Sequence, residues 1–197
     1  MMNKQKHWYD YLYLWSILYF TLGFFNILFA WLGLIDFLVP LIFAIYSGNK
    51  NFCNRYCGRG QLLQLLGSRL KLSQYRSTPG FISGKYFRYG FLIFFLTMFS
   101  SMLLQTYLVA SQAASLKEVL NLLWIFQVPW HFAYPIEITG WIAQFSFGFY
   151  NIMLTSTIMG LIAMLLWKPR SWCTFCPMGT MTQGICKIKK GIKIKHR

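Results

Sequence analysis

Two short segments carry the residues of this chain that could do chemistry, and each contains a close pair of cysteines. Three residues separate Cys53 from Cys57, and two separate Cys173 from Cys176. Four thiolates are the common ligand set of an iron–sulfur cluster, and a tetrahedral zinc site uses the same four sulfurs. The spacing therefore predicts one shared metal centre and leaves iron and zinc both open.

The residues that follow the cysteines suit an anionic centre. Gly58 and Gly60 would let backbone N–H groups approach the sulfurs, and Pro177 can begin a turn or a helix. A helix that starts there would stabilise a thiolate-rich cluster with its N-terminus. We expect the surroundings of the centre to be formed by Arg55, Gly58, Arg59, Gly60, Pro177 and Gly179.

A fifth cysteine, Cys186, lies ten residues after Cys176. We expect it to be a spare thiol, and the alternative is that it replaces one of the four ligands. The tight pairing of the other four favours metal or redox chemistry over structural disulfides.

The composition indicates an all-α integral membrane protein. The chain of 197 residues is 56% hydrophobic and only 12% charged, whereas a soluble domain has about 25% charged residues. Its net charge of +15 could suggest a nucleic-acid partner. However, the Lys and Arg residues flank apolar runs, as the positive-inside rule requires of a membrane protein. We therefore expect membrane lipid, and no nucleic acid, around this chain.

The apolar runs predict a single membrane domain, residues 1–197, with about four transmembrane helices. A tight turn over 32–36 is expected to separate the first two. The second is only about 22 Å long as a helix, which suits a short span or a re-entrant segment in a core of about 30 Å. The spans are placed at 9–31, 33–47, 86–110 and 141–167.

The remaining segments are expected at the two membrane surfaces. The cluster loops are placed at 48–67 and 168–186, and a leucine-rich interfacial helix follows Gly60. The spacing of apolar residues over 116–126 predicts an amphipathic helix on the other side.

Four crossings place both termini and both cysteine pairs on one side of the membrane. Every Lys and Arg except Lys117 falls on that side, and Asp36, Glu118 and Glu137 fall on the other. By the positive-inside rule, the cysteine side is the cytoplasmic face of a bacterial-type cytoplasmic membrane.

The two cysteine segments, residues 50–66 and 168–179, resemble a membrane 4Fe-4S family related to NapH and NosR, with paired motifs of the form aromatic-Cys-x3-Cys-Pro-x-Gly. The resemblance implies one [4Fe-4S] cluster, and a relay of electrons between a quinol pool or flavin and partner proteins. Three departures are visible: Gly58 stands where the family has Pro, the second gap is two residues, and the soluble ferredoxin segment is absent. The chain resembles the membrane core alone.

These observations lead to an expected function and two alternatives. We expect Cys53, Cys57, Cys173 and Cys176 to hold one cluster that relays electrons between a cytoplasmic donor and a quinone, a flavin or a partner redox subunit. A zinc-stapled structural subunit is one alternative. A membrane thiol–disulfide oxidoreductase is the other, although such enzymes work on the oxidising side. Whether the chain is an enzyme by itself is left open.

Two further features have simple interpretations. His131, between Trp130 and Phe132, is expected to be an interfacial residue, with a quinone contact as the alternative. The basic tail, residues 187–197, is expected to bind anionic lipid headgroups, with docking of an acidic redox protein as the alternative.

Overall fold

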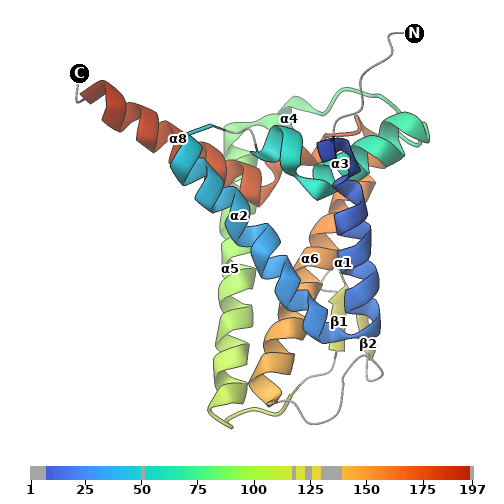
Figure 1. Ribbon diagram of the computed structural model, residues 1–197, viewed down its shortest axis with the longest axis vertical. Helices are drawn as coiled ribbons and strands as arrows, with labels where there is room; N and C mark the ends of the chain where they lie inside the picture. Colours follow the sequence, from blue (N-terminus) through green and yellow to red (C-terminus); the bar gives the residue numbers. More distant parts are fainter. Residues whose placement is uncertain (1–7, 50–51, 117–118, 123–125, 130–138, 196–197) are drawn as a thin grey trace.

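The computed structural model describes residues 8–49, 52–116, 119–122, 126–129 and 139–195. The regular secondary structure of this part of the chain is helical except for one two-stranded hairpin (Figure 1). The long elements are α1 (Tyr13–Phe25), α2 (Leu32–Ser47), α5 (Lys85–Ala110) and α6 (Gly140–Leu166). The short helices are α3 (Gly58–Gln64), α4 (Gly80–Ser83) and α7 (Trp172–Phe175), and α8 (Pro177–Lys195) ends the described chain.

Among the described residues, three helical stretches are long and apolar enough to cross a membrane. They are Ile27–Ser47, Lys85–Ala110 and Gly140–Leu166. The helices expected at 86–110 and 141–167 are therefore confirmed to within one residue. Length and composition thus make a membrane protein plausible, and the described fold confirms the helical class.

The turn between the first two apolar segments lies earlier than the sequence indicated. Helix α1 ends at Phe25, and Asn26 has an extended backbone, with its side chain accepting a hydrogen bond from the Leu28 N–H at 3.0 Å. A 3₁₀ turn, η2 (Ile27–Trp31), then leads directly into α2. The expected helix over 9–31 and the expected turn over 32–36 are therefore wrong, because the chain reverses at Asn26 and stays helical through 36.

The amphipathic helix expected over 116–126 is also wrong. Val119–Leu122 (β1) and Phe126–Pro129 (β2) instead form an antiparallel pair in which Leu120 lies opposite Val128. The apolar spacing that suggested a helix is equally compatible with a short strand. His131, Lys117, Glu118 and Glu137 lie outside the described residues.

The short helices gather at the end of the molecule where α1 begins, and the hairpin lies near the other end (Figure 1). Helix α8 contacts the end of α2, where Lys189 donates hydrogen bonds to the carbonyls of Ile45 and Tyr46 at 2.5 and 2.7 Å. Gly48 ends α2 in the left-handed conformation, with φ of 63°, which a residue without Cβ adopts at low cost. A cation at these last carbonyls also complements the helix dipole.

A small aromatic core supports the second cysteine pair. Trp172 and Phe175 are buried, with ring centroids 5.0 Å apart, and each ring packs edge-on against Phe91 of α5. Leu63 of α3 belongs to the same core. Packing therefore joins α3, which follows the first cysteine pair, to α7, which carries part of the second.

Candidate metal centre

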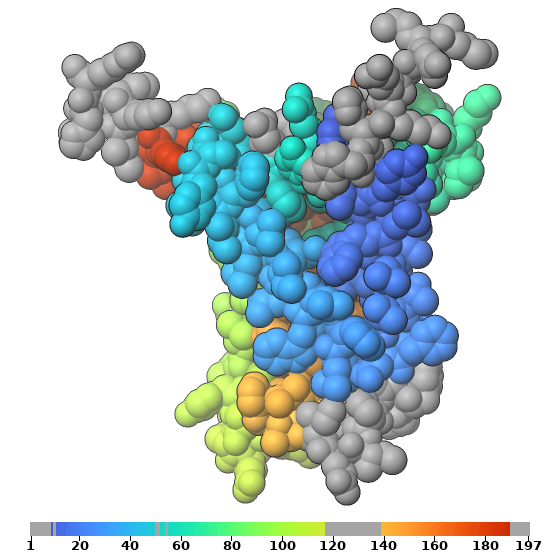
Figure 2. Space-filling model, viewed as in Figure 1, coloured from blue at the N-terminus to red at the C-terminus, as the bar shows by residue number. Residues whose placement is uncertain are grey.

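The four paired cysteines line one cavity of about 520 Å³. Cys53 lies in a π-helical turn, η3 (Phe52–Tyr56), and Cys57 is the residue before α3. Cys173 lies in α7, and Cys176 stands between α7 and α8. The two regions expected to be loops are thus largely helical. Figure 2 shows a hollow between α1 and α2 in this part of the molecule.

Gly60 marks the place where the two cysteine segments meet. A Cβ added to this buried glycine would lie 3.7 Å from Cys57 Sγ and 3.9 Å from Cys173 Sγ. Sulfurs from distant parts of the sequence therefore come together beside the same backbone atom. A larger residue at position 60 would occupy space between them.

The cysteines share this cavity without converging on a single point. Within the described residues, no three His, Cys, Asp or Glu side chains are close enough together to hold a metal ion. Four sulfurs bound to one zinc ion at about 2.3 Å would lie within about 4 Å of one another. The arrangement is therefore more open than a single-ion site requires.

Burial strongly disfavours thiolates here when the cavity holds no cation. Although Cys173 is partly open to the cavity, the protein around its sulfur raises the pKa of its thiol to about 12 by desolvation, with a smaller rise from Cys57. Burial also raises the pKa of Cys176, whereas Arg59 and the backbone N–H groups of Gly179 and Met178 lower it. A bound cation would reverse this preference, because metal ligation deprotonates thiols.

The start of α8 is aimed at the cavity as the sequence predicted. Met178 and Gly179 lie in the first turn of α8, and their N–H groups hydrogen bond to the Cys176 sulfur. The first N–H groups of a helix have no partner within the helix. Here they meet a sulfur, which gives that sulfur a preference for negative charge.

Thr182, one turn further along α8, contacts the first cysteine pair. Its hydroxyl donates a hydrogen bond of 3.1 Å to the Gly179 carbonyl oxygen, and the same hydroxyl oxygen lies 3.6 Å from Cys53 Sγ. The side chain is almost completely buried, at 1% exposure. In the thiol form Cys53 can donate to Thr182, and in the thiolate form only the hydroxyl can donate.

Arg59 places a positive charge in the wall of the cavity. It lines the cavity, and its Nη1 donates a hydrogen bond of 2.7 Å to Ser156 of α6. Its charge acts on both Cys176 and Asp36. The guanidinium is therefore held by α6 while it faces the acidic groups of the cavity.

Most of the expected surroundings are brought together. Gly58, Arg59, Gly60 and Gly179 line the cavity. The structure does not bring the other two to its wall, because Arg55 is exposed at the surface and Pro177 lines a separate small cavity. Cys186, the possible substitute ligand, is buried in α8 and does not line the cavity.

Sequence reasoning misplaced one residue that lines the cavity. Asp36, expected in a turn on the far side of the membrane, lies within α2 and accepts a 2.9 Å hydrogen bond from the Trp15 indole. An acidic residue inside an apolar membrane helix is itself a signal of function. That signal would have identified Asp36 if residues 27–47 had been interpreted as one helix. Trp15 and Thr182 gave no such signal.

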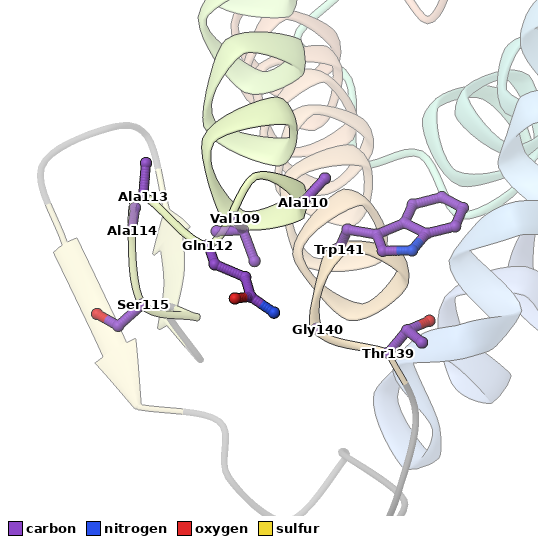
Figure 3. A pocket seen from close by; sticks show the side chains of 9 residues that line it. All are labelled: Val109, Ala110, Gln112, Ala113, Ala114, Ser115, Thr139, Gly140 and Trp141. Carbon is purple, nitrogen blue, oxygen red and sulfur yellow. The ribbon is translucent and has the colours of Figure 1, made fainter.

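A second hollow of about 580 Å³ lies at the opposite end, between the end of α5 and the start of α6 (Figure 3). Its lining includes Gln112, Ser115, Thr139 and Trp141 and contains no cysteine or ionisable side chain. The cysteine cavity is therefore the better candidate for chemistry.

Comparison of the chain with protein-family models, with curated proteins and with solved structures gave no match.

Proposed function

We propose that this chain is an integral membrane iron–sulfur protein that passes single electrons between a cytoplasmic donor and a quinone, a flavin or a partner redox subunit. Cys53, Cys57, Cys173 and Cys176 hold one [4Fe-4S] cluster. The observation that carries the proposal is that two cysteine pairs, far apart in the sequence, line one cavity. The likeness of both motifs to the NapH/NosR-related membrane family is in agreement with it.

The cavity wall carries the four thiols that a [4Fe-4S] cluster takes as ligands. A cluster has a metal atom for each thiolate, so its ligands stand further apart than four ligands of one zinc ion. The chain also supplies what an anionic cluster needs: the Arg59 charge and the N–H groups of Met178 and Gly179. When bound, the cluster accepts and releases one electron at a time.

The orientation in the membrane is part of the proposal. Four crossings are made by α1, Ile27–Ser47, α5 and α6, with the cysteines on the cytoplasmic side. Helix α1 has 13 residues, about 20 Å, and the 3₁₀ turn Trp8–Tyr11 before it lengthens the helical segment. Positive charge supports the assignment, because α8 and the segment 69–88 bring most of the Lys and Arg residues to the cysteine end.

Purification without oxygen, followed by measurement of iron, acid-labile sulfide and zinc, tests the proposed function. We expect about four iron and four sulfide per chain, with the broad visible absorption of a cluster. Zinc in place of iron, with no visible absorption, would establish the zinc-stapled alternative and overturn electron transfer.

Labelling of added cysteines with a membrane-impermeant maleimide separates the relay from a thiol–disulfide oxidoreductase. Ser77 lies in the segment that precedes α4, at the cysteine end of the molecule, and Ser111 follows α5 at the other end. Both residues are exposed. We expect Ser111→Cys to react in whole cells and Ser77→Cys to react only in inverted vesicles, above the background of the unmodified chain. The reverse result would put the native cysteines on the oxidising side and favour the oxidoreductase.

Replacement of Thr182 by Val should lower the reduction potential of the cluster. Hydrogen bonds to the sulfurs are among the factors that set such potentials, and the Thr182 hydroxyl is placed to donate to Cys53. A hydrogen bond of about 1 kcal/mol corresponds to about 40 mV for one electron. A redox titration followed by electron paramagnetic resonance measures the shift.

Two variants control this measurement. Thr182→Ser keeps the hydroxyl and should keep the potential. Thr157→Val removes a hydroxyl that donates to the Met153 carbonyl in α6, away from the cysteines, and should also leave it unchanged. An equal shift in Thr157→Val would mean that the change at Thr182 reflects general disturbance of the fold.

A further inference from the structure

Asp36 is an ionisable side chain near the middle of a helix that is apolar enough to span a membrane. The helical stretch runs from Ile27 to Ser47, and Asp36 is the only acidic or basic residue in it. Such residues are costly in lipid and usually face an internal cavity with a specific role. Asp36 faces the cavity that also contains the four cysteines.

The surroundings of Asp36 give its carboxyl group one hydrogen-bond donor and one nearby cation. Trp15 of α1 donates an indole hydrogen bond of 2.9 Å, and Arg59 of α3 acts on it as the nearby cation. The Tyr19 hydroxyl is almost fully buried, interacts electrostatically with Asp36, and has no hydrogen-bond partner among the described residues. Hydrogen-bonding capacity therefore remains beside Asp36 for a water molecule or a proton.

Asp36 and the cysteine site share one cation. The Arg59 guanidinium acts on Asp36 and on Cys176, and its hydrogen bond to Ser156 fixes it in place. Additional negative charge at the cysteines would offset more of the Arg59 charge, which would then stabilise the Asp36 carboxylate less. An ionised Asp36 would then become less favourable in surroundings where few other charges can compensate.

We propose that Asp36 is a proton-binding site that is coupled to reduction of the cysteine-bound cluster. As one electron from the cytoplasmic donor enters the site, the Asp36 carboxylate takes up one proton from bulk solvent by way of the cavity. It releases that proton when the electron leaves, so charge in the cavity stays constant. The inference rests on the proposed function. The ionisable groups around Asp36 are Tyr19 on α1, Tyr56 in η3, Arg59 on α3, Tyr150 on α6 and the four cysteines.

The test is the pH dependence of the reduction potential of the purified, cluster-loaded protein. We expect the potential to fall by about 59 mV per pH unit over part of the range between pH 5 and pH 9, the value for one proton per electron. Asp36→Asn should abolish this slope, and Asp36→Glu should restore it. Trp15→Phe removes the hydrogen bond to the carboxylate and should move the sloping region to higher pH.

The outcomes distinguish this inference from the proposed function. If the cluster-loaded wild-type protein has a reduction potential that does not depend on pH, the proposal of a proton site at Asp36 is wrong, and the proposal of a cluster is unaffected. An unchanged slope in Asp36→Asn, with normal iron content, would also overturn it. Absence of iron from the wild-type protein would instead overturn the proposed function itself.

Discussion

Replacement of Cys57 by Ser is expected to remove the proposed cluster from the purified protein. Cys57 stands at the meeting point of the two cysteine segments, beside Gly60 and Cys173. A serine hydroxyl is a much weaker ligand than a thiolate, because it is not deprotonated at neutral pH. Iron and sulfide should fall to background, and the visible absorption should disappear. Cys53→Ser, Cys173→Ser and Cys176→Ser should give the same loss.

Cys186 provides a matched control within the same chain. It is also buried, but it lies in α8 and does not line the cavity. Cys186→Ser should therefore keep the full content of iron and sulfide. Loss of the cluster in Cys186→Ser would show that the proposed ligand set is wrong, and retention in Cys57→Ser would show the same.

The second large effect is expected at Gly58, the first residue of α3. A Cβ at this position would lie 2.7 Å from Ser16 Oγ and 2.8 Å from the Leu12 carbonyl oxygen of the neighbouring α1 segment. The carbonyl belongs to the backbone and cannot rotate away, so Gly58→Ala must push α1 from α3. We expect the free energy of unfolding to fall by about 1–3 kcal/mol, as it does at other overpacked sites.

Thermal unfolding in detergent, followed by circular dichroism, measures this change against Gly90→Ala. Gly90 lies inside α5, and a Cβ there would meet nothing within 4 Å. Since alanine favours helix by up to about 1 kcal/mol over glycine, Gly90→Ala should leave the unfolding midpoint unchanged or raise it. Equal midpoints for Gly58→Ala and the wild-type protein would contradict the close packing of α1 on α3.

The same contact gives a physical reason why position 58 is glycine and could not be proline. Proline is favoured in the first turn of a helix, and Gly58 is the first residue of α3. The backbone there would accept it, but a ring would need the space that Leu12 and Ser16 occupy. The close approach of a neighbouring helix therefore requires glycine at position 58, and a single sequence does not reveal this contact.

Features that depend on composition or on local spacing could be predicted from the sequence. Helices α5 and α6 lie where long apolar runs with basic flanks placed them. The meeting of the two cysteine pairs followed from their similar spacing and from the Gly or Pro after each pair. Pro177 begins a helix, as its type suggested.

Features that depend on contacts between distant residues could not be predicted. Gly33 suggested a turn, yet it lies within α2, where a Cβ would meet the Tyr19 hydroxyl at 2.5 Å and the Phe149 ring at 2.8 Å. Gly33 has no side chain, and this lets α2 pack closely against α1 and α6. Asp36 looked like part of the same turn because its partner, Trp15, belongs to another helix. The pairing of β1 with β2 likewise became evident only from the structure.

The residues that line the cysteine cavity come from distant parts of the sequence, and this constrains the order in which the site can form during synthesis. Cys53 and its neighbour Thr182 are 129 positions apart, so the first cysteine pair is synthesised long before α8. Closing so long a loop costs conformational entropy that only the completed contacts offset. Until then the early thiols have neither their partner cysteines nor the N-terminus of α8. We therefore expect the proposed cluster to be loaded only after translation of α8, and a chain that stops after α6 should be unable to retain it.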